Sequence, residues 1–111
     1  MEDHDGVWKY ATYSNFRLGD ASAEYNLEFD TYSGTAGDAL AFNKGNNFST
    51  YDNDINSCSA LYGGGWWYSH CHNANLNGFY GNVLYGKGLV WKQWHGHYYS
   101  LKTTEMKIRR I

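Results

Sequence analysis

The chain has 111 residues, the length of one small domain. Hydrophobic residues make up 42% of it and aromatic residues 19%, with 11 Tyr, 5 Trp, 5 Phe, 13 Gly and no Pro. This composition argues against a disordered tail, a helical bundle, a coiled coil and collagen. No apolar run approaches the roughly 20 residues of a membrane span, so we expect no transmembrane segment.

Charge is unevenly divided along the chain, although the formal net charge is only −2. Residues 1–57 hold ten acidic and three basic side chains, a formal charge of −7. Residues 58–111 hold one acidic and six basic side chains, a formal charge of +5. Halves of opposite charge attract each other, which favours one folded unit. The basic side chains are too sparse for a nucleic-acid-binding patch, so we expect no nucleic-acid partner.

Two segments in the first part of the chain have the pattern of β-strands. Residues 7–13 read as a strand with apolar and aromatic side chains on mixed faces, and residues 25–29 alternate with period two. Residues 34–40 predict a turn that leads into a short, weakly helical piece. Residues 43–47 form a polar loop that ends at Asn47, which begins an Asn-Phe-Ser glycosylation sequon if the protein is secreted.

Loop chemistry dominates the second part of the chain. Residues 51–65 are rich in Asp, Asn and Ser and end in three glycines, whereas the aromatic run 66–68 predicts a buried or half-buried strand. Turns are predicted at 73–78 and 86–88, and the alternation within 99–109 predicts a closing strand. There is no internal repeat, linker or second domain. The sequence therefore predicts a loop-rich, β-dominated α+β fold.

Cys58 and Cys71 are separated by twelve residues and are the two cysteines of the chain. A disulfide that closes this loop would stabilise the fold by about 3 kcal/mol, and two reduced thiols are the alternative. His70 and His72 flank Cys71 and allow a zinc site on paper. Successive residues of a strand point to opposite faces, so these three side chains cannot converge on one ion if the segment is extended. We therefore do not favour zinc.

Asp52 and Asp54 place two carboxylates two residues apart in a polar loop. A hard cation such as calcium prefers oxygen ligands, and such a loop can add backbone carbonyls and water to the two side chains. The alternative is that these residues only make turns by hydrogen bonding to their own backbone. The loop lacks an EF-hand pattern, so the spacing alone favours the turn.

No catalytic motif is present in the sequence. It lacks a nucleophile elbow, a Gly-rich phosphate loop and a His-Glu-x-x-His motif, and the spacing of its five histidines selects no triad. We therefore expect no enzymatic activity.

The acidic and polar start of the chain, residues 1–6, is not a secretory signal peptide.

Several motifs, in order along nearly the whole chain, resemble the fibrinogen C-terminal domain family. They are Phe16–Asp20, Tyr25–Leu27, Tyr32–Asp38, Phe48–Asp54, Cys58, Gly64–Tyr68, Cys71–His72, Asn75–Tyr80, Gly88–Trp91, Ser100–Lys102 and Glu105–Arg109. The family domain is longer, and its amino-terminal half carries another disulfide and much of the central sheet. The resemblance thus implies that residues 1–111 form a partial domain, truncated on its amino-terminal side, so that Met1 is internal to a longer product or the chain is a fragment.

The resemblance also assigns Cys58 and Cys71 to the family's second disulfide and implies secretion. The absence of a signal peptide then fits a fragment better than a cytosolic protein. The family's calcium site uses two aspartates of this loop, here Asp52 and Asp54, with backbone carbonyls of Asn56 and nearby residues. The loop before Cys58 is shorter than usual in the family, which leaves open whether those carbonyls reach the ion.

Lectins of this family, such as ficolins and tachylectins, bind an acetyl group in an aromatic funnel beside the calcium loop. Its carbonyl oxygen meets backbone N–H groups at a cis peptide bond, which would lie here between His70 and Cys71. Carried over by position, the funnel residues are Tyr62, His72, Tyr85, Gly86 and His97. A methyl group suits an aromatic wall, and an amide needs a donor and an acceptor at the rim. The alternative is that these are ordinary aromatic residues of a β-rich fold.

Two of the funnel positions depart from the lectin pattern. Gly86 stands where related lectins often have Ala, so we expect it to widen the pocket. His97 stands where they have an aromatic residue, so we expect a polar, pH-sensitive edge.

The leading hypothesis is a secreted recognition module that binds acetylated carbohydrates or another acetylated ligand, with calcium support, in innate immunity. Such a site is weak alone, so we expect the full-length protein to be a homo-oligomer. The alternatives are a receptor- or matrix-binding interaction domain like those of angiopoietins and tenascins, and an inactive fragment. An intact aromatic funnel favours the lectin, and a blocked funnel favours the interaction domain.

Overall fold

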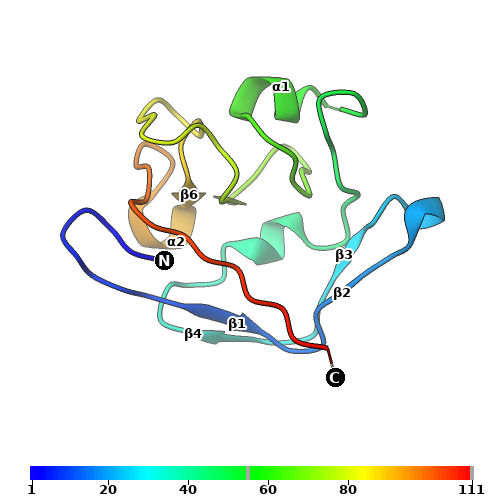
Figure 1. Ribbon diagram of the computed structural model, residues 1–111, viewed down its shortest axis with the longest axis horizontal. Coiled ribbons are helices and arrows are strands. Elements are labelled where there is room, and N and C mark those ends of the chain that lie inside the picture. The colour runs from blue at the N-terminus through cyan, green and yellow to red at the C-terminus, as the bar shows by residue number, and fades with distance from the viewer. Residues whose placement is uncertain (55, 111) are drawn as a thin grey trace.

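The structure is a computed structural model that describes residues 1–54 and 56–110 (Figure 1). Its strands pair in three separate antiparallel ladders: β1 (Ala11–Tyr13) with β4 (Tyr32–Gly34), β2 (Arg17–Leu18) with β3 (Leu27–Glu28), and β5 (Ala74–Asn75) with β6 (Val90–Trp91). In the described residues no ladder has more than three residue pairs. Most of the chain is loop, so strand pairing alone cannot hold it together.

The helices are equally short: α1 (Cys58–Tyr62), α2 (Lys92–His95) and the 3-10 turns η1 (Ala21–Ala23) and η2 (Leu40–Asn43). The start of α1 is capped by Asp54, whose carboxylate accepts hydrogen bonds from the N–H groups of Ser59 and Ala60. Gly63 ends the helix with a φ of 76°, which glycine adopts without steric cost. No helix among the described residues is long and apolar enough to cross a membrane.

Aromatic side chains fill the core. Trp66 is 1% exposed and its ring centroid lies 5.1 Å from that of Trp67. Trp67 in turn meets Phe48 edge to face at 5.1 Å, and its indole N–H donates to the carbonyl of Tyr25 at 3.0 Å. One tryptophan therefore joins three segments that are far apart in the sequence, with its polar atom satisfied.

The molecule is thin, with backbone extents of 42 × 33 × 18 Å. A helix with its side chains is about 10–12 Å wide, and packed sheets lie about 10 Å apart. A thickness of 18 Å therefore leaves room for no more than two layers of backbone around the core.

The buried side chain of Asn43, at the end of η2, joins three loop segments. Its amide nitrogen donates to the carbonyls of Trp67 at 3.0 Å and Cys71 at 3.2 Å, and its oxygen accepts from the N–H of Ala74 at 3.4 Å. Asn43 is 0% exposed, so water cannot replace these bonds. This one amide fixes the path of the chain from Trp67 to β5.

The first residues of the chain pair with the segment around Thr103. Glu2 and Thr103 exchange backbone hydrogen bonds of 2.8 and 3.2 Å. Next to them, the carboxylate of Asp3 lies 3.0 Å from Nε2 of His95. Among the described residues this is the one close contact between an acidic side chain of the first half and a His, Lys or Arg side chain of the second half.

The periodicity of the first half locates its strands but overstates their length. The predicted strand 7–13 contains β1, and the strand 25–29 contains β3. The turn 34–40 leads into η2, as expected. The predicted loop 51–65 contains α1, because Asp54 caps a turn of helix that its polar composition hides.

Two predictions in the second half are wrong. Residues 66–68 are buried as expected but are not a strand, since only Trp66 forms a bridge, with Ser49. Residues 99–109 do not form a closing strand, since only Thr103 pairs. Within the described residues no neighbouring strand lies alongside 104–110 to complete a ladder.

Replacing Asn43 by Ala should lower the free energy of unfolding by about 3 kcal/mol, because two carbonyls and one N–H lose a buried partner. Urea unfolding followed by fluorescence measures the change. The matched control is Asn56→Ala, which removes one exposed bond to the carbonyl of Ser69 and should cost about 1 kcal/mol or less. Equal losses in the two variants would contradict the role given to Asn43.

Candidate functional site

Cys58 and Cys71 form a disulfide that ties the first residue of α1 to the segment before β5. Their Cα atoms are 5.3 Å apart, within the usual range. The predicted pairing is therefore confirmed. Both sulfurs are consumed by the bond, so neither is a thiolate ligand for the zinc site considered from sequence.

Four of the residues predicted to form the funnel are joined by ring contacts that start from the ring of His72. They are Tyr62, His72, Tyr85 and His97. The ring centroid of His72 lies 5.0 Å from that of Tyr62, edge to face, and 5.7 Å from that of His97. Tyr85 covers His97 at 4.6 Å. Together with Gly86 these side chains are named here the His72 cluster. They come from α1, from the segment before β5, from the loop before β6 and from the segment after α2.

Three hydrogen bonds connect the backbone of the His72 cluster. Nε2 of His72 lies 2.8 Å from the carbonyl oxygen of Gly86, and Nε2 of His97 lies 3.1 Å from that of His72. The N–H of Gly86 donates to the carbonyl of His97 at 2.7 Å. Carbonyl oxygens only accept, so both Nε2 atoms carry the proton. Nδ1 of His72 is then a buried acceptor that has no partner among the described residues.

Burial keeps His72 neutral. Burial is the main reason why the pKa of His72 is lowered to about 4; the hydrogen bond to the carbonyl of Gly86 opposes this shift, and the neighbouring His97 adds to it. At neutral pH the floor of the cluster is therefore uncharged, with aromatic walls. Such a surface suits an apolar or neutral polar group rather than an ion.

Gly86 does not widen the site, contrary to the sequence-based expectation. A Cβ built at Gly86 would lie 2.7 Å from Cε1 of Tyr62 and 3.4 Å from Nε2 of His72. The ring of Tyr62 thus occupies the space that the missing side chain leaves. The φ of Gly86 is 67°, so a larger residue would also be strained there.

The cis peptide bond expected between His70 and Cys71 is absent, and no cis bond occurs among the described residues. The backbone turns instead through a hydrogen bond of 2.9 Å from the N–H of Ser69 to the carbonyl of Cys71. A trans bond avoids the cost of about 3 kcal/mol that a non-proline cis bond carries. His70 is exposed and its ring lies outside the cluster.

Backbone donors are nevertheless available beside the cluster. The hydrogen bonds among the described residues use neither the N–H of Cys71 nor that of His72. Both groups belong to the turn that the disulfide and Asn43 hold in place. They can donate to an acceptor brought by a ligand.

The predicted calcium residues have separate roles in the loop before α1. Asp52 is exposed and accepts a hydrogen bond of 2.5 Å from the hydroxyl of Thr50. Asp54 uses one oxygen for Ser59 and the other for Ala60. Each carboxylate oxygen keeps a further lone pair, so the donor set remains compatible with a hard cation. Calcium binding stays a prediction.

Asn56 turns its side chain away from these aspartates. Its amide nitrogen donates to the carbonyl of Ser69 at 3.0 Å, and residue 55 lies outside the described residues. Among the described residues no three His, Cys, Asp or Glu side chains group around one point. Any further ligands of the ion would be backbone carbonyls and water.

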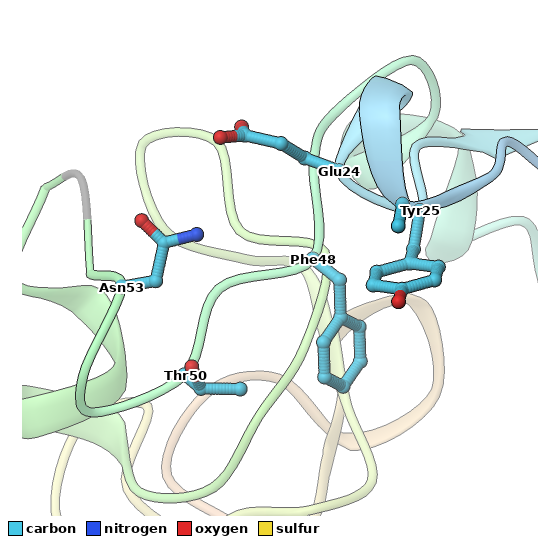
Figure 2. Close-up of a pocket in the computed structure, with 6 residues that line it drawn as sticks. Glu24, Tyr25, Phe48, Thr50 and Asn53 are labelled. Carbon is cyan, nitrogen blue, oxygen red and sulfur yellow. The ribbon is translucent and has the colours of Figure 1, made fainter.

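A pocket of about 260 Å³ that sequence analysis missed lies between η1 and the chain after Phe48 (Figure 2). It is lined by Ala21, Glu24, Tyr25, Phe48, Thr50 and Asn53. Glu24 and Tyr25 have positive φ values of 52° and 56°. Neither residue type favours a positive φ, so the sequence does not predict the turn that forms this pocket. The carboxylate of Glu24 accepts a hydrogen bond from the side-chain amide nitrogen of half-buried Asn47 at 2.6 Å.

The same Asn47 begins the predicted glycosylation sequon. Glycosylation at Asn47 stays a prediction.

Exposed apolar side chains adjoin the His72 cluster. Tyr98 packs edge to face on Tyr85 at 5.4 Å and is 68% exposed. Val83 and Leu84, which precede Tyr85, are more than 60% exposed. Such a grouping on a small domain is typical of a binding surface.

The stability of the protein should depend on His72 between pH 6.5 and about 4, where the unfolded chain binds a proton that the folded chain does not. The free energy of unfolding should fall by about 2 kcal/mol from about pH 7.5 to about pH 5. Urea unfolding at the two pH values tests this. In His72→Gln, which does not titrate but can still donate to Gly86, the fall should disappear. His70→Gln is the matched exposed control, and a His72→Gln variant that keeps the full pH dependence would contradict the assignment.

Comparison with known proteins identifies the family to which this chain is similar. Residues 1–111 match the family described as the C-terminal globular domain of fibrinogen beta and gamma chains. Mouse Tenascin is 44% identical over 98% of this chain, which covers 5% of that protein. Techylectin-5A of Tachypleus tridentatus is 40% identical over 100% of this chain, which covers 40% of that protein.

Among solved structures, the fibrinogen-like globe domain of human ANGPTL2 has a TM-score of 0.84 and 36% identity. The alignment covers 92% of this chain and 51% of that domain. The chain thus spans about half the length of this relative and a smaller share of mouse Tenascin and Techylectin-5A. The small, loop-rich fold with short strands is thereby confirmed, as is the family suggested by the sequence motifs. The chain belongs to the family of fibrinogen C-terminal globular domains.

Proposed function

We propose that the protein is an extracellular recognition module that binds an acetyl group, as found on N-acetylated glycans, at the His72 cluster. The observation that carries the proposal is a set of ring contacts. Tyr62 and His97 both contact a buried, neutral His72, and Tyr85 in turn contacts His97. The disulfide supports an oxidising compartment and hence secretion. Techylectin-5A, named as a lectin, supports a carbohydrate ligand.

The chemistry of the cluster fits both parts of an acetyl group. The methyl group would contact the aromatic rings of Tyr85 and His97, which are partly exposed. The carbonyl oxygen would accept from the unused N–H groups of Cys71 and His72. The neutral floor disfavours a charged ligand, which would lose hydration there without an opposite charge in return.

One acetyl group offers little area, so a single site should be weak, near millimolar. Useful affinity then requires several copies on one assembly, and we propose that the full-length protein is a homo-oligomer. No catalytic step is proposed, since binding explains every group in the cluster.

Calcium would act at a distance from the ligand. We propose that Asp52 and Asp54 hold it in the loop before α1. Because Asp54 also caps α1, an ion there would brace the helix that carries Tyr62. It would thus support the pocket without touching the acetyl group.

The second candidate is a protein-interaction domain for a receptor or matrix partner. The exposed apolar residues Val83, Leu84 and Tyr98 favour it, as does the identity to mouse Tenascin. The ring of Tyr62 also fills the space beside Gly86, so the funnel is narrower than the sequence predicts. An inactive fragment would show neither activity.

The protein should be retained on an acetylated resin and should elute with N-acetylglucosamine or acetate but not with glucose. Tyr85→Ala should weaken retention about tenfold, because it removes one wall of the pocket. The matched control is Tyr51→Ala, which removes a tyrosine that is 88% exposed and should change nothing. Equal elution by glucose and N-acetylglucosamine would reject acetyl recognition and favour the protein-interaction domain.

Millimolar calcium should raise the melting temperature of the protein by mass action, as measured by differential scanning calorimetry. Asp52→Asn should abolish the rise without unfolding α1, because the one side-chain hydrogen bond of Asp52 within the described residues comes from the hydroxyl of Thr50. Asp54 is the poorer test, since its loss also uncaps the helix. No shift in the parent protein would mean that the shortened loop does not bind the ion.

A further inference from the structure

The pocket between η1 and the chain after Phe48, named here the Glu24 pocket, shares no lining residue with the His72 cluster. Its volume of about 260 Å³ lies just below the range of sites for drug-sized ligands, so it suits one sugar ring or a smaller group. Figure 2 shows the carboxylate of Glu24 and the amide of Asn53 reaching toward the same space, with the rings of Phe48 and Tyr25 beside it. The Glu24 pocket thus combines one charged group with aromatic walls.

Contacts with the core hold the aromatic side of the Glu24 pocket in place. The carbonyl of Tyr25 accepts a hydrogen bond from the indole N–H of buried Trp67 at 3.0 Å, and the ring of Phe48 meets the same Trp67 at 5.1 Å. The N–H of Phe48 donates to the carbonyl of Glu24 at 3.0 Å, which joins the two segments that line the pocket. The walls are therefore formed before any ligand arrives.

The backbone at Glu24 and Tyr25 is left-handed, although a side chain makes this conformation costly. Such strain persists only where surrounding contacts enforce it. Here the bond from the N–H of Phe48 to the carbonyl of Glu24 does so, together with a bond of 3.1 Å from the N–H of Tyr25 to the carbonyl of Asp20. A glycine would adopt this turn more easily, but it would bring no carboxylate to the pocket.

The carboxylate of Glu24 is the one charged group that lines the pocket. It accepts a hydrogen bond from the side-chain amide of Asn47 through Oε2, and Oε1 has no hydrogen-bond partner among the described residues. No Lys, Arg or His side chain of the described residues pairs with it. The aromatic rings beside it also attract positive charge through their faces. This combination favours a small organic cation.

Thr50 and Asn53 give the pocket a neutral polar edge. The exposed amide of Asn53 offers two donors and one acceptor, and the hydroxyl of Thr50, which donates to Asp52, can still accept. The hydroxyl groups of a sugar need such partners, whereas the aliphatic part of a lysine side chain brings no group to use them. Among organic cations the pocket therefore favours an amino sugar.

We propose that the Glu24 pocket binds an amino sugar that has a free, protonated amine, such as glucosamine. The ammonium group pairs with Glu24, the apolar face of the sugar ring packs on Tyr25 and Phe48, and hydroxyl groups bond to Thr50 and Asn53. An acetylated amine carries no charge and gains nothing from Glu24. On a partly acetylated glycan, the Glu24 pocket and the His72 cluster would thus recognise the two states of the same nitrogen.

The probe is glucosamine at about pH 6, where its amine, like an α-amino group, is protonated. NMR spectra should show the backbone amides of Glu24, Tyr25 and Phe48 shifting with a dissociation constant near millimolar. Glucose and N-acetylglucosamine should bind there at least about fivefold more weakly, because they have no charge to pair. Raising the salt concentration from about 0.05 to about 0.5 M should weaken glucosamine binding.

Glu24→Gln should weaken glucosamine binding about fivefold and remove its dependence on salt, because glutamine still accepts from Asn47 but carries no charge. The matched control is Glu28→Gln, which removes a half-buried carboxylate that lies outside the pocket and should change neither property. Tyr85→Ala, which weakens the acetyl site, should leave glucosamine binding unchanged. The two sites therefore succeed or fail separately.

Two results would overturn the proposal. The first is that glucosamine shifts none of these amides, or that glucose shifts them with equal affinity, since the charge of Glu24 would then have no role. The second is that butylamine, which carries the ammonium group of a lysine side chain without hydroxyl groups, binds as tightly as glucosamine. That result would assign the Glu24 pocket to a lysine side chain of a protein partner.

Discussion

A single buried amide governs the geometry on which the proposed function depends. The side chain of Asn43, which is itself fully buried, holds Trp67, Cys71 and Ala74 by hydrogen bonds. The disulfide fixes the same turn from the other side, through Cys58 of α1. Between these two constraints the turn needs no strand partner. It still holds His72 in a defined position, together with the N–H groups of Cys71 and His72, which have no acceptor among the described residues.

The high content of aromatic residues follows from the shortness of the strands and helices. Ladders of two or three residue pairs bury little surface, so large rings must supply most of the core. Trp67 packs against Phe48 and Trp66 and bonds to the backbone of Tyr25. Each ring both fills volume and fixes the relative position of loops, which a smaller aliphatic side chain could not do.

Sequence motifs predicted which loop residues lie together better than periodicity predicted the strands. Tyr62, His72, Tyr85 and His97 do converge, because their positions match a family pattern of loops rather than a regular element. Periodicity reports which face of a segment is apolar and not whether a partner lies beside it, so it failed at 99–109. The effect of Gly86 was not predictable either, since a missing Cβ leaves either open space or room for a neighbouring ring.

The pairing of Glu2 with Thr103 has a consequence for folding. The two residues are 101 positions apart, so their contact closes a loop that contains almost all of the described residues. The loop between Cys58 and Cys71, with a separation of 13, can close far earlier. The disulfide loop is therefore a local step in folding, whereas the pairing of Glu2 with Thr103 depends on long-range closure, which makes folding slow.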